Sequence, residues 1–174
     1  AGATLPDPKD KAHILAMYRD AVDALSAQRW DDGARGLAAI LKEDPGMTDV
    51  WSQYATTLVR LGDLRGAYTA WREVVSRKPD EPSGLLGAAS VLAALERHDE
   101  ARTYAELAIT RAPAAAHQAL ASLAVSQRRA DEARRHADLA EQADASLPMR
   151  SMIEGLLRYH AGDYAGAVPH LEQA

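Results

Sequence analysis

Histidine is the residue type in this chain whose chemistry first suggests a metal site, and there are six. Two imidazoles can bind one metal ion from a helix when they are spaced as in H-x-x-x-H or H-E-x-x-H. No pair has that spacing among His13, His98, His117, His136, His160 and His170. The chain has no cysteine, which excludes disulfides and metal sites built on sulfur. We expect no metal centre and no cofactor, and interpret His98 and His117 as packed or half-buried side chains.

Nucleophilic and phosphate-binding motifs are the next chemistry to consider. The sequence contains neither a glycine-rich phosphate loop nor a G-x-S-x-G elbow. Residues 146–150 read Ser-Leu-Pro-Met-Arg, which resembles the S-x-P-x-R core of the sulfatase signature. The string falls between two predicted helices, where serine can cap and proline can start a helix, and no carboxylate metal site precedes it. We therefore interpret it as a turn and predict that the chain is not an enzyme.

The charge pattern argues against nucleic acid as a partner. The formal net charge is −5, whereas a protein that binds phosphates normally concentrates Lys and Arg. A basic cluster lies within residues 128–136, but Asp131 and Glu132 interrupt it, which is typical of a solvated helix face. The longest apolar run, residues 84–95, is too short to span a bilayer. We interpret it as a buried helix and expect a soluble chain without direct membrane insertion, in a compartment that the sequence leaves open.

Apolar periodicity predicts the helices that would position these side chains. Two sets of residues within 48–81 recur at helical spacing: Trp51, Tyr54, Ala55 and Leu58, then Ala67, Trp71, Val74 and Val75. Gly62 separates the sets, and Pro79 ends the second helix. Small residues let two helices approach closely, so we expect Ala55 to face Ala67, with Trp51 and Trp71 filling the gaps on either side.

The same pattern recurs along the chain. Gly33, Ala67 and Ala101 are 34 residues apart, Ala133 follows Ala101 by 32, and Ala167 follows Ala133 by 34. We predict five units, residues 14–47, 48–81, 82–113, 114–147 and 148–174, the last incomplete, after an extended lead-in over residues 1–13. The third unit is two residues short, and we place the deletion in the turn after Pro113, where it predicts a tightened junction.

The unit with Trp51, Ala55, Gly62, Ala67 and Pro79 resembles the tetratricopeptide repeat family, and the resemblance covers about residues 14–174. It implies an all-α, right-handed α-solenoid of antiparallel helix pairs, in which the first helix of each unit lines a concave groove. It also implies a bacterial-type protein–protein interaction scaffold. The residues expected to face the groove and bind a peptide or helix are Ser52, Gln53, Thr56, Arg60, Leu86, Ser90, Gln118, Ser122, Met152, Leu156 and Tyr159.

Two interpretations of this groove stay open. Its small, neutral and mildly apolar side chains could bind a partner by shape and buried area, or could form a solvated wall. Family members that clamp the C-terminal carboxylate of chaperone tails use Lys, Asn and Arg in the groove, and only Arg60 approaches that set. We therefore do not expect a chaperone-tail clamp.

A different hypothesis makes the chain a structural or oligomerising module of a larger bacterial protein, with a homodimer formed through the terminal repeat. Met149, Met152 and Tyr159 on the groove side of the fifth unit suit adaptable contacts, or cover an open end. Residues 5–11 resemble the segment that precedes the repeats in the tail regions of some bacterial sulfatase-like hydrolases. The chain begins without Met and stops in mid-pattern, so we expect it to be a piece of a longer protein.

Overall fold

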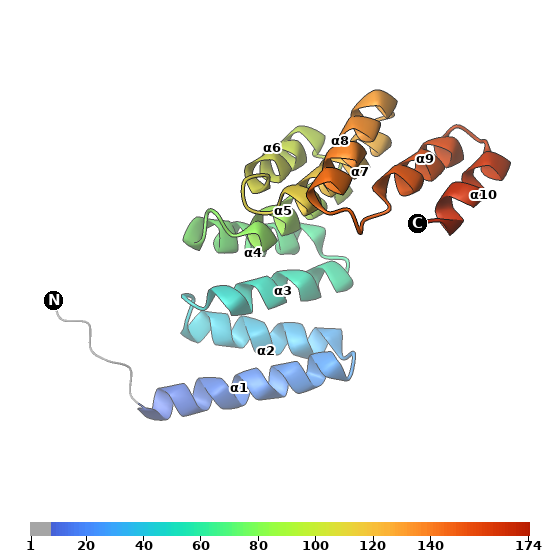
Figure 1. Ribbon diagram of the computed structural model, residues 1–174. Helices are drawn as coiled ribbons and strands as arrows, with labels where there is room; N and C mark the ends of the chain where they lie inside the picture. The colour runs from blue at the N-terminus through green and yellow to red at the C-terminus, as the bar shows by residue number, and fades with distance from the viewer. Residues whose placement is uncertain (1–7) are drawn as a thin grey trace. The chain divides into compact units, whose positions relative to one another are not determined.

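The computed structural model describes residues 8–174, with side chains from residue 12 onward. Within that range the chain forms ten α-helices and no strand (Figure 1). They are α1 (Pro8–Ser26), α2 (Trp30–Glu43), α3 (Thr48–Arg60), α4 (Leu64–Arg77), α5 (Pro82–Ala94), α6 (His98–Ala108), α7 (Pro113–Ser126), α8 (Ala130–Ala143), α9 (Met149–His160) and α10 (Tyr164–Glu172). They belong to two compact units, residues 1–78 and 79–174. The predicted class, an all-α solenoid of antiparallel helix pairs, is confirmed.

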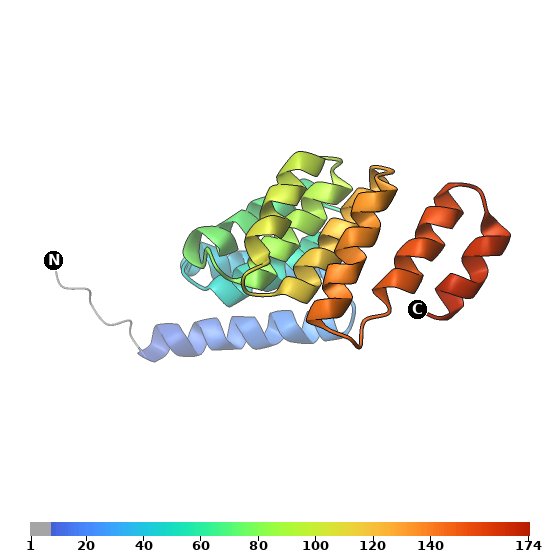
Figure 2. The ribbon, with the colours of Figure 1, turned by 45° about the horizontal axis from the view of Figure 1, so that its top comes forward.

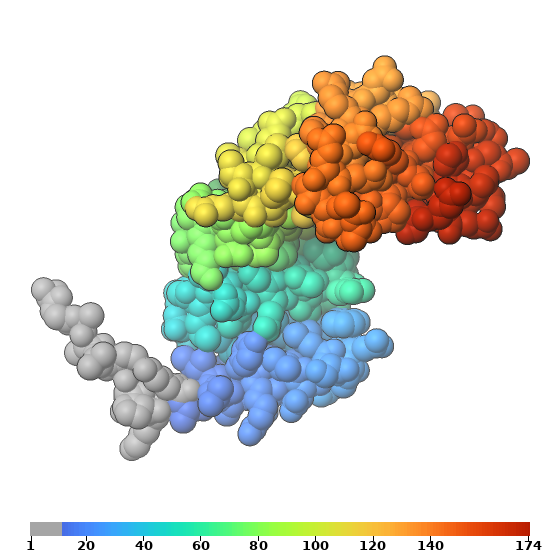
Figure 3. All heavy atoms as spheres, in the orientation of Figure 1, coloured from blue at the N-terminus to red at the C-terminus, as the bar shows by residue number. Residues whose placement is uncertain are grey.

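In the first unit, the apolar faces of α1 to α4 form the core. Leu37 and Ile40 of α2 are fully buried and cluster with Val50 of α3. Ala55 and Ala67 are also fully buried, as expected where α3 and α4 approach closely. Figure 3 shows that side chains occupy the gaps seen between the ribbons of α1 and α2.

The two tryptophans of this unit differ in their surroundings. Trp71 is buried, as the sequence predicts. Trp51 is only half-buried, and its indole N–H donates a hydrogen bond of 2.9 Å to the Pro45 carbonyl oxygen. The Arg77 guanidinium lies 5.6 Å from the Trp51 ring centroid. Trp51 therefore seals the edge of the helix pair, whereas Trp71 fills its interior.

The second unit has a core built chiefly from alanine. Six of its fully buried residues in α6 to α8 are Ala108, Ala121, Ala124, Ala133, Ala137 and Ala140. Met149 and Ile153 of α9 cluster with five of these alanines, and Leu85, Leu92 and Leu120 are further large side chains buried in this unit. Small residues permit the close antiparallel packing of these helices, and Figure 2 shows the last pair, α9 and α10, running side by side in opposite directions.

Every helix pair turns at a residue with positive φ. These residues are Gln28 (57°), Gly62 (79°), Glu96 (60°), Arg128 (58°) and Gly162 (82°). They are separated by 34, 34, 32 and 34 residues, so the turn repeats with the same period as the apolar faces. Glycine adopts this conformation readily, whereas a side chain makes it unfavourable. Three of the five turns therefore carry backbone strain.

The residue after each positive-φ position is the N-cap of the second helix of the pair, and two of these N-caps are aspartates. Asp63 and Asp163 follow the two glycine turns, and each accepts a hydrogen bond of 2.9 Å from the backbone N–H three residues on, at Gly66 and Gly166. A Cβ at Gly66 would lie 2.3 Å from Asp63 Oδ2, so any larger residue at this position would require the Asp63 carboxylate to shift.

The three strained turns are followed by arginine instead. Each arginine pairs with an acidic side chain three residues on: Arg29 with Asp32 at 3.2 Å, Arg97 with Glu100 at 2.6 Å and Arg129 with Glu132 at 3.5 Å. The acid lies in the first turn of the second helix, where the helix dipole favours negative charge. The second helix of a pair therefore begins in one of two ways: with an aspartate cap after a glycine turn, or with an arginine–acid ion pair after a strained turn.

The lead-in predicted over residues 1–13 is wrong for residues 8–13, because α1 begins at Pro8. Proline lacks an N–H, but the first turn of a helix does not use that donor, so Pro8 can open a helix. The part of the prediction that covers residues 1–7 lies outside the described residues.

The deletion in the third unit also lies elsewhere than predicted. Helix α6 has 11 residues, whereas α2, α4 and α8 each have 14. Pro113 is the first residue of α7 rather than the end of the third unit. The chain therefore loses the last turn of α6, before Pro113, and the turn after Pro113 is helical. Spacing aligned Pro113 with Pro79, but a proline can precede or open a helix equally well.

The apolar run over residues 84–95 forms most of α5, where Leu85 and Leu92 are buried. The prediction of a buried helix is confirmed. In the part of the chain that the structure describes, no helix is at once long and apolar enough to cross a membrane.

Candidate partner-binding surfaces

The second unit contains a groove between α5 and α7 with a volume of about 390 Å³. Its walls and floor are Leu86, Ala89, Ser90 and Ala93 of α5, Ala101 and Ala105 of α6, and Ala115, Gln118, Ala119, Ser122, Leu123 and Ser126 of α7. We call this set the α5–α7 groove. The cavity exists because most of its side chains are alanine or serine, which leave the space between two packed helices unfilled.

Four of the predicted groove residues line the α5–α7 groove. They are Leu86, which is half-buried, and Ser90, Gln118 and Ser122, which lie in the walls of the groove. They come from the first helices of two successive pairs. The repeat register, with an offset of 32 residues between the third and fourth units, placed them on one side of each helix, and the structure brings them together.

The walls of the α5–α7 groove carry no Asp, Glu, Lys or Arg. The sequences of α5 and α7 contain none of these residues at all, although 26% of the chain is charged. Their one titratable side chain is His117, which is not part of the groove lining. Hydrogen-bonding side chains are limited to three serines and Gln118, and the Ser126 hydroxyl donates to the Leu123 carbonyl oxygen at 2.7 Å. The groove is therefore uncharged and poor in polar partners.

The predicted groove residues of α3 lie in the first unit and engage that unit's own atoms. The Ser52 hydroxyl donates to the Thr48 carbonyl oxygen at 3.3 Å, and the Thr56 hydroxyl donates to the Ser52 carbonyl oxygen at 2.9 Å. The Gln53 amide donates to the Tyr18 hydroxyl of α1. These hydrogen bonds hold the side chains against the protein.

Arg60, the fourth predicted residue of α3, contacts an aromatic ring. Its guanidinium carbon lies 5.9 Å from the centroid of the Trp30 ring at the start of α2. A cation over the face of an indole is stabilised by the ring quadrupole. This contact draws the one basic residue expected in the groove toward α2.

The predicted residues of α9 do not line the α5–α7 groove. Met152 and Leu156 are partly buried against the core cluster that contains Ala121, Ala137 and Ile153. Tyr159 is 53% exposed and forms an edge-to-face pair with Tyr164 of α10, with ring centroids 5.3 Å apart.

Helix α9 also presents a different face to its neighbours than the earlier first helices do. Met149 and Ile153 are buried, whereas Ser151, Glu154 and Arg158 occupy the repeat positions of Trp51, Tyr54 and Leu58. Polar side chains at three normally apolar positions explain this difference, because they favour solvent or ion pairs over a core.

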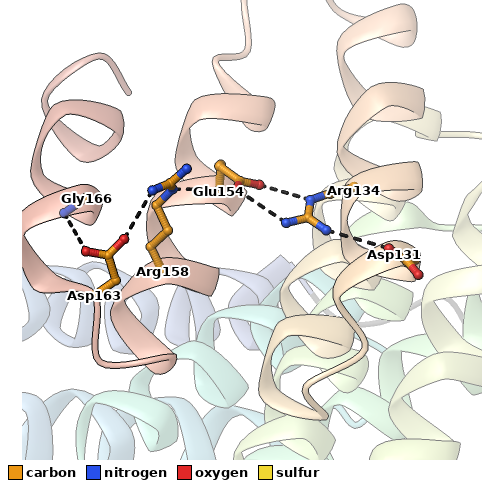
Figure 4. Close-up of polar contacts among 6 residues, drawn as sticks. All are labelled: Asp131, Arg134, Glu154, Arg158, Asp163 and Gly166. Atoms are coloured by element: carbon orange, nitrogen blue, oxygen red, sulfur yellow. Dashed lines mark hydrogen bonds and ion pairs between the residues drawn. The ribbon is translucent and has the colours of Figure 1, made fainter.

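A chain of ion pairs connects α8, α9 and α10 at this polar face (Figure 4). Arg134 of α8 donates to Glu154 of α9 at 3.0 Å and lies 3.6 Å from Asp131. Arg158 lies 3.6 Å from Glu154 and donates to Asp163 at 3.1 Å. The hydrogen bonds from Arg134 hold the pKa of the Glu154 carboxyl below its ordinary value. The basic cluster predicted to be a solvated face is thus partly engaged, through Arg134, in holding the last pair.

His117 of α7 and His136 of α8 form a pair that sequence reasoning missed. Their Nδ1 atoms are 3.2 Å apart, so one ring donates a hydrogen bond to the other. Burial lowers the pKa of His117, and burial together with the nearby His117 lowers that of His136. The available signal was their location on the two helices of one hairpin. His117 is half-buried, as expected.

Metal ligands do not gather elsewhere in residues 12–174. No three His, Cys, Asp or Glu side chains in that range are placed to hold one ion. The histidine pair lacks a third ligand of these types, and the lining of the α5–α7 groove contains no His, Asp or Glu side chain.

Comparison with known proteins adds to this geometry. Residues 53–116 match the family model of the tetratricopeptide repeat. This part of the chain therefore carries tetratricopeptide repeats. Three solved structures are similar to this chain in fold. A thermophilic tetratricopeptide protein from Thermus thermophilus is 20% identical with a TM-score of 0.72, over 92% of this chain and 91% of that one. MamA from Desulfovibrio magneticus is 17% identical with a TM-score of 0.75, over 92% of each chain.

The third structure is PilW, described as a type IV pilus biogenesis factor. It is 18% identical with a TM-score of 0.75, over 92% of this chain and 75% of its own. At identities this low, the structural likeness shows the fold alone. The partner must be argued from the repeats of this chain. No curated protein matches the chain in sequence.

Proposed function

We propose that this tetratricopeptide protein is a non-catalytic scaffold that binds a segment of a partner protein in the α5–α7 groove. The observation that carries the proposal is the convergence of Leu86, Ser90, Gln118 and Ser122 on one uncharged cavity. Residues from two successive first helices form its walls, and recessed apolar surface is a common feature of protein recognition sites.

The same walls give no support for catalysis. The groove lining consists of Ala, Leu, Ser and Gln. A serine nucleophile needs an adjacent base, and the lining contains no histidine, carboxylate or lysine. Clamping of a chaperone-tail carboxylate also lacks support, because Arg60 contacts Trp30 and the walls offer no cation.

Site-specific photocrosslinking tests the proposal. A photoreactive amino acid is placed at Ser122, on the groove wall, and as a matched control at Thr103, which is exposed on α6 outside the groove lining. The crosslinked segment is then synthesised and titrated against the purified protein. Saturable binding that Ser122→Arg weakens and Thr103→Arg leaves unchanged supports the groove, whereas equal binding to both variants contradicts it.

A second candidate function, self-association through the terminal repeat, is favoured by α10. Leu37, Ala105 and Ala137 occupy one repeat position and are buried, each clustered with residues of the following helix. Leu171 occupies that position in α10 and is 40% exposed. Tyr164 and Val168 extend the stripe, at 62% and 51% exposure. These residues lie at i, i+4 and i+7, so they form one apolar helix face.

A second copy is the occupant that this face suits best. Helix α10 carries a single formal charge, at Glu172, so two copies can pack α10 on α10 with little repulsion. A head-to-tail stack would instead bring this face onto α1, which carries Asp20 and Asp23. In this hypothesis the chain is a structural module of a larger protein. The resemblance of this chain to the tail regions of sulfatase-like hydrolases rests on residues 5–11. Of these, residues 5–7 lie outside the described residues.

Sedimentation across a range of concentrations tests the second candidate. We expect the protein to dimerise and Val168→Glu to make it monomeric, because a charge would be buried in the interface. Leu15→Glu is the control, since Leu15 is 68% exposed on α1. A wild-type protein that stays monomeric, or equal effects of both substitutions, would exclude the α10 interface.

A further inference from the structure

Taking the proposed function as its basis, we infer that the occupant of the α5–α7 groove is an amphipathic α-helix that presents an uncharged apolar stripe to the groove. The alternative within the same function is an extended peptide. Three features of the groove separate the two occupants: its lack of charge, its lack of polar partners, and the size of its wall residues.

The lack of charge determines the side chains that can enter. A charged group that leaves water needs an opposite charge or several hydrogen bonds in return. The walls contain no ionised side chain, and all of α5 and α7 contains no Asp, Glu, Lys or Arg. A partner segment that brings Lys, Arg, Asp or Glu into the groove would therefore lose binding free energy, and an apolar stripe would gain it.

The lack of polar partners determines the backbone conformation. An extended peptide has unpaired N–H and C=O groups, and a groove that buries them must supply partners. The lining residues belong to α5, α6 and α7, whose interior backbone groups are already paired within each helix. Only Gln118 and three serine side chains remain, and Ser126 already donates to its own helix. A helix pairs its own backbone groups and makes no such demand.

The sizes of the wall residues fit helix side chains. Ala89 of α5 and Ala105 of α6 line the groove and also cluster with the buried Leu120 of α7. The protein thus already seats a leucine from one helix between alanines of two others. The groove of about 390 Å³ admits a few side chains of this kind, within the range of about 300–1,000 Å³ typical of ligand sites. An entering helix would insert its ridge and keep its backbone outside.

Two display libraries of equal length test this inference on the full chain. One library has Leu and Ala at i, i+3, i+4 and i+7 with charged residues elsewhere. The other keeps Leu and Ala at these positions but replaces some of the charged residues by prolines, which prevent helix formation. Both are selected against the wild-type protein and counter-selected against Ser90→Arg. Enriched peptides are then titrated against wild type, Ser122→Arg and the control Thr103→Arg.

The inference predicts enrichment from the helical library, a helical circular dichroism signal on binding, and affinity about tenfold weaker for Ser122→Arg with no change for Thr103→Arg. Enrichment from the proline library alone, with the same sensitivity to Ser122→Arg, would overturn the helical occupant and keep the proposed function. Enrichment from neither library would overturn both. Thermal unfolding of each variant shows whether an effect comes from the groove or from loss of the fold.

Discussion

Gln28 and Gly62 close the same turn in successive helix pairs, both with left-handed backbone, at φ of 57° and 79°. A side chain is unfavourable in this conformation by about 1–2 kcal/mol relative to glycine. Because Gln28 is exposed and a Cβ at Gly62 would meet no atom within 4 Å, backbone strain is the main difference between the two turns.

Exchanging these residue types should therefore move stability in opposite directions. We expect Gln28→Gly to raise the free energy of unfolding by roughly 0.5–1 kcal/mol, since relief of strain exceeds the extra entropy of glycine in the unfolded chain. Gly62→Ala should lower it by about 1 kcal/mol. Urea unfolding of both variants measures these changes, and a loss of stability in Gln28→Gly would contradict the account of the turn.

The two tryptophans of the first unit predict unequal losses. Trp71 is 8% exposed, and Trp71→Ala should cost about 3–5 kcal/mol through lost burial and a residual cavity. Trp51 is half-buried at the edge, so Trp51→Ala should cost clearly less and leave the Pro45 carbonyl oxygen to water. Comparing the two variants in one unfolding experiment checks this. Equal losses would mean that the edge contact matters as much as the interior one.

The repeat register was predictable because residue type and spacing agree at many positions. Gly33, Ala67 and Ala101 are each buried where the two helices of a pair approach closely. Each unit therefore needs a small residue at this position. The start of α1 and the shortening of α6 were not predictable in the same way. Proline is compatible with the loop before a helix and with its first turn, and residue spacing does not distinguish the two.

The candidate site was predictable only in part for a related reason. The register placed Leu86, Ser90, Gln118 and Ser122 on a common side, and the cavity formed because their neighbours are alanines. The register could not show that the Gln53 amide donates to the Tyr18 hydroxyl, because that hydrogen bond joins two different helix pairs. The different face of α9 follows from the ion pairs of Glu154 and Arg158. Glu154 pairs with Arg134 of the preceding helix and Arg158 with Asp163 of the following turn, and spacing within α9 does not reveal either partner.

The His117–His136 pair predicts a loss of stability in mild acid. Both pKa values are lowered in the folded protein, chiefly by burial, so the unfolded chain binds protons more readily. Stability contributed by the neutral pair is present above the unfolded value of 6.5 and declines as the pH falls through it. Nearby Glu132 favours protonation of His136, whereas Arg102 and Arg135 oppose it.

Thermal midpoints between about pH 7.5 and pH 5.5 measure this effect in the range where histidine titrates. The wild-type midpoint should fall more steeply with decreasing pH than that of the double variant His117→Gln, His136→Gln. The other histidines remain in both proteins and serve as the internal control. Identical slopes would show that protonation of the pair does not oppose folding.

The ion pairs of Figure 4 predict that salt loosens the last helix pair. Glu154→Gln removes the charge that Arg134 and Arg158 share, so α9 and α10 should exchange backbone hydrogens faster. Raising the ionic strength to about 1 M should have the same effect on the wild type, since it reduces the Debye length to about 3 Å. Asp32→Asn, which removes an ion pair in the first unit, is the control. Salt-independent exchange in wild-type α9 would contradict this role.

The most direct test of the central claim is the affinity of the segment crosslinked at Ser122 for wild type, Ser122→Arg and Thr103→Arg, measured by fluorescence anisotropy. The claim predicts saturable binding to wild type and Thr103→Arg, and a loss of about tenfold or more in Ser122→Arg, because a charge would enter an uncharged groove. Equal affinity for all three proteins would show that the partner binds elsewhere.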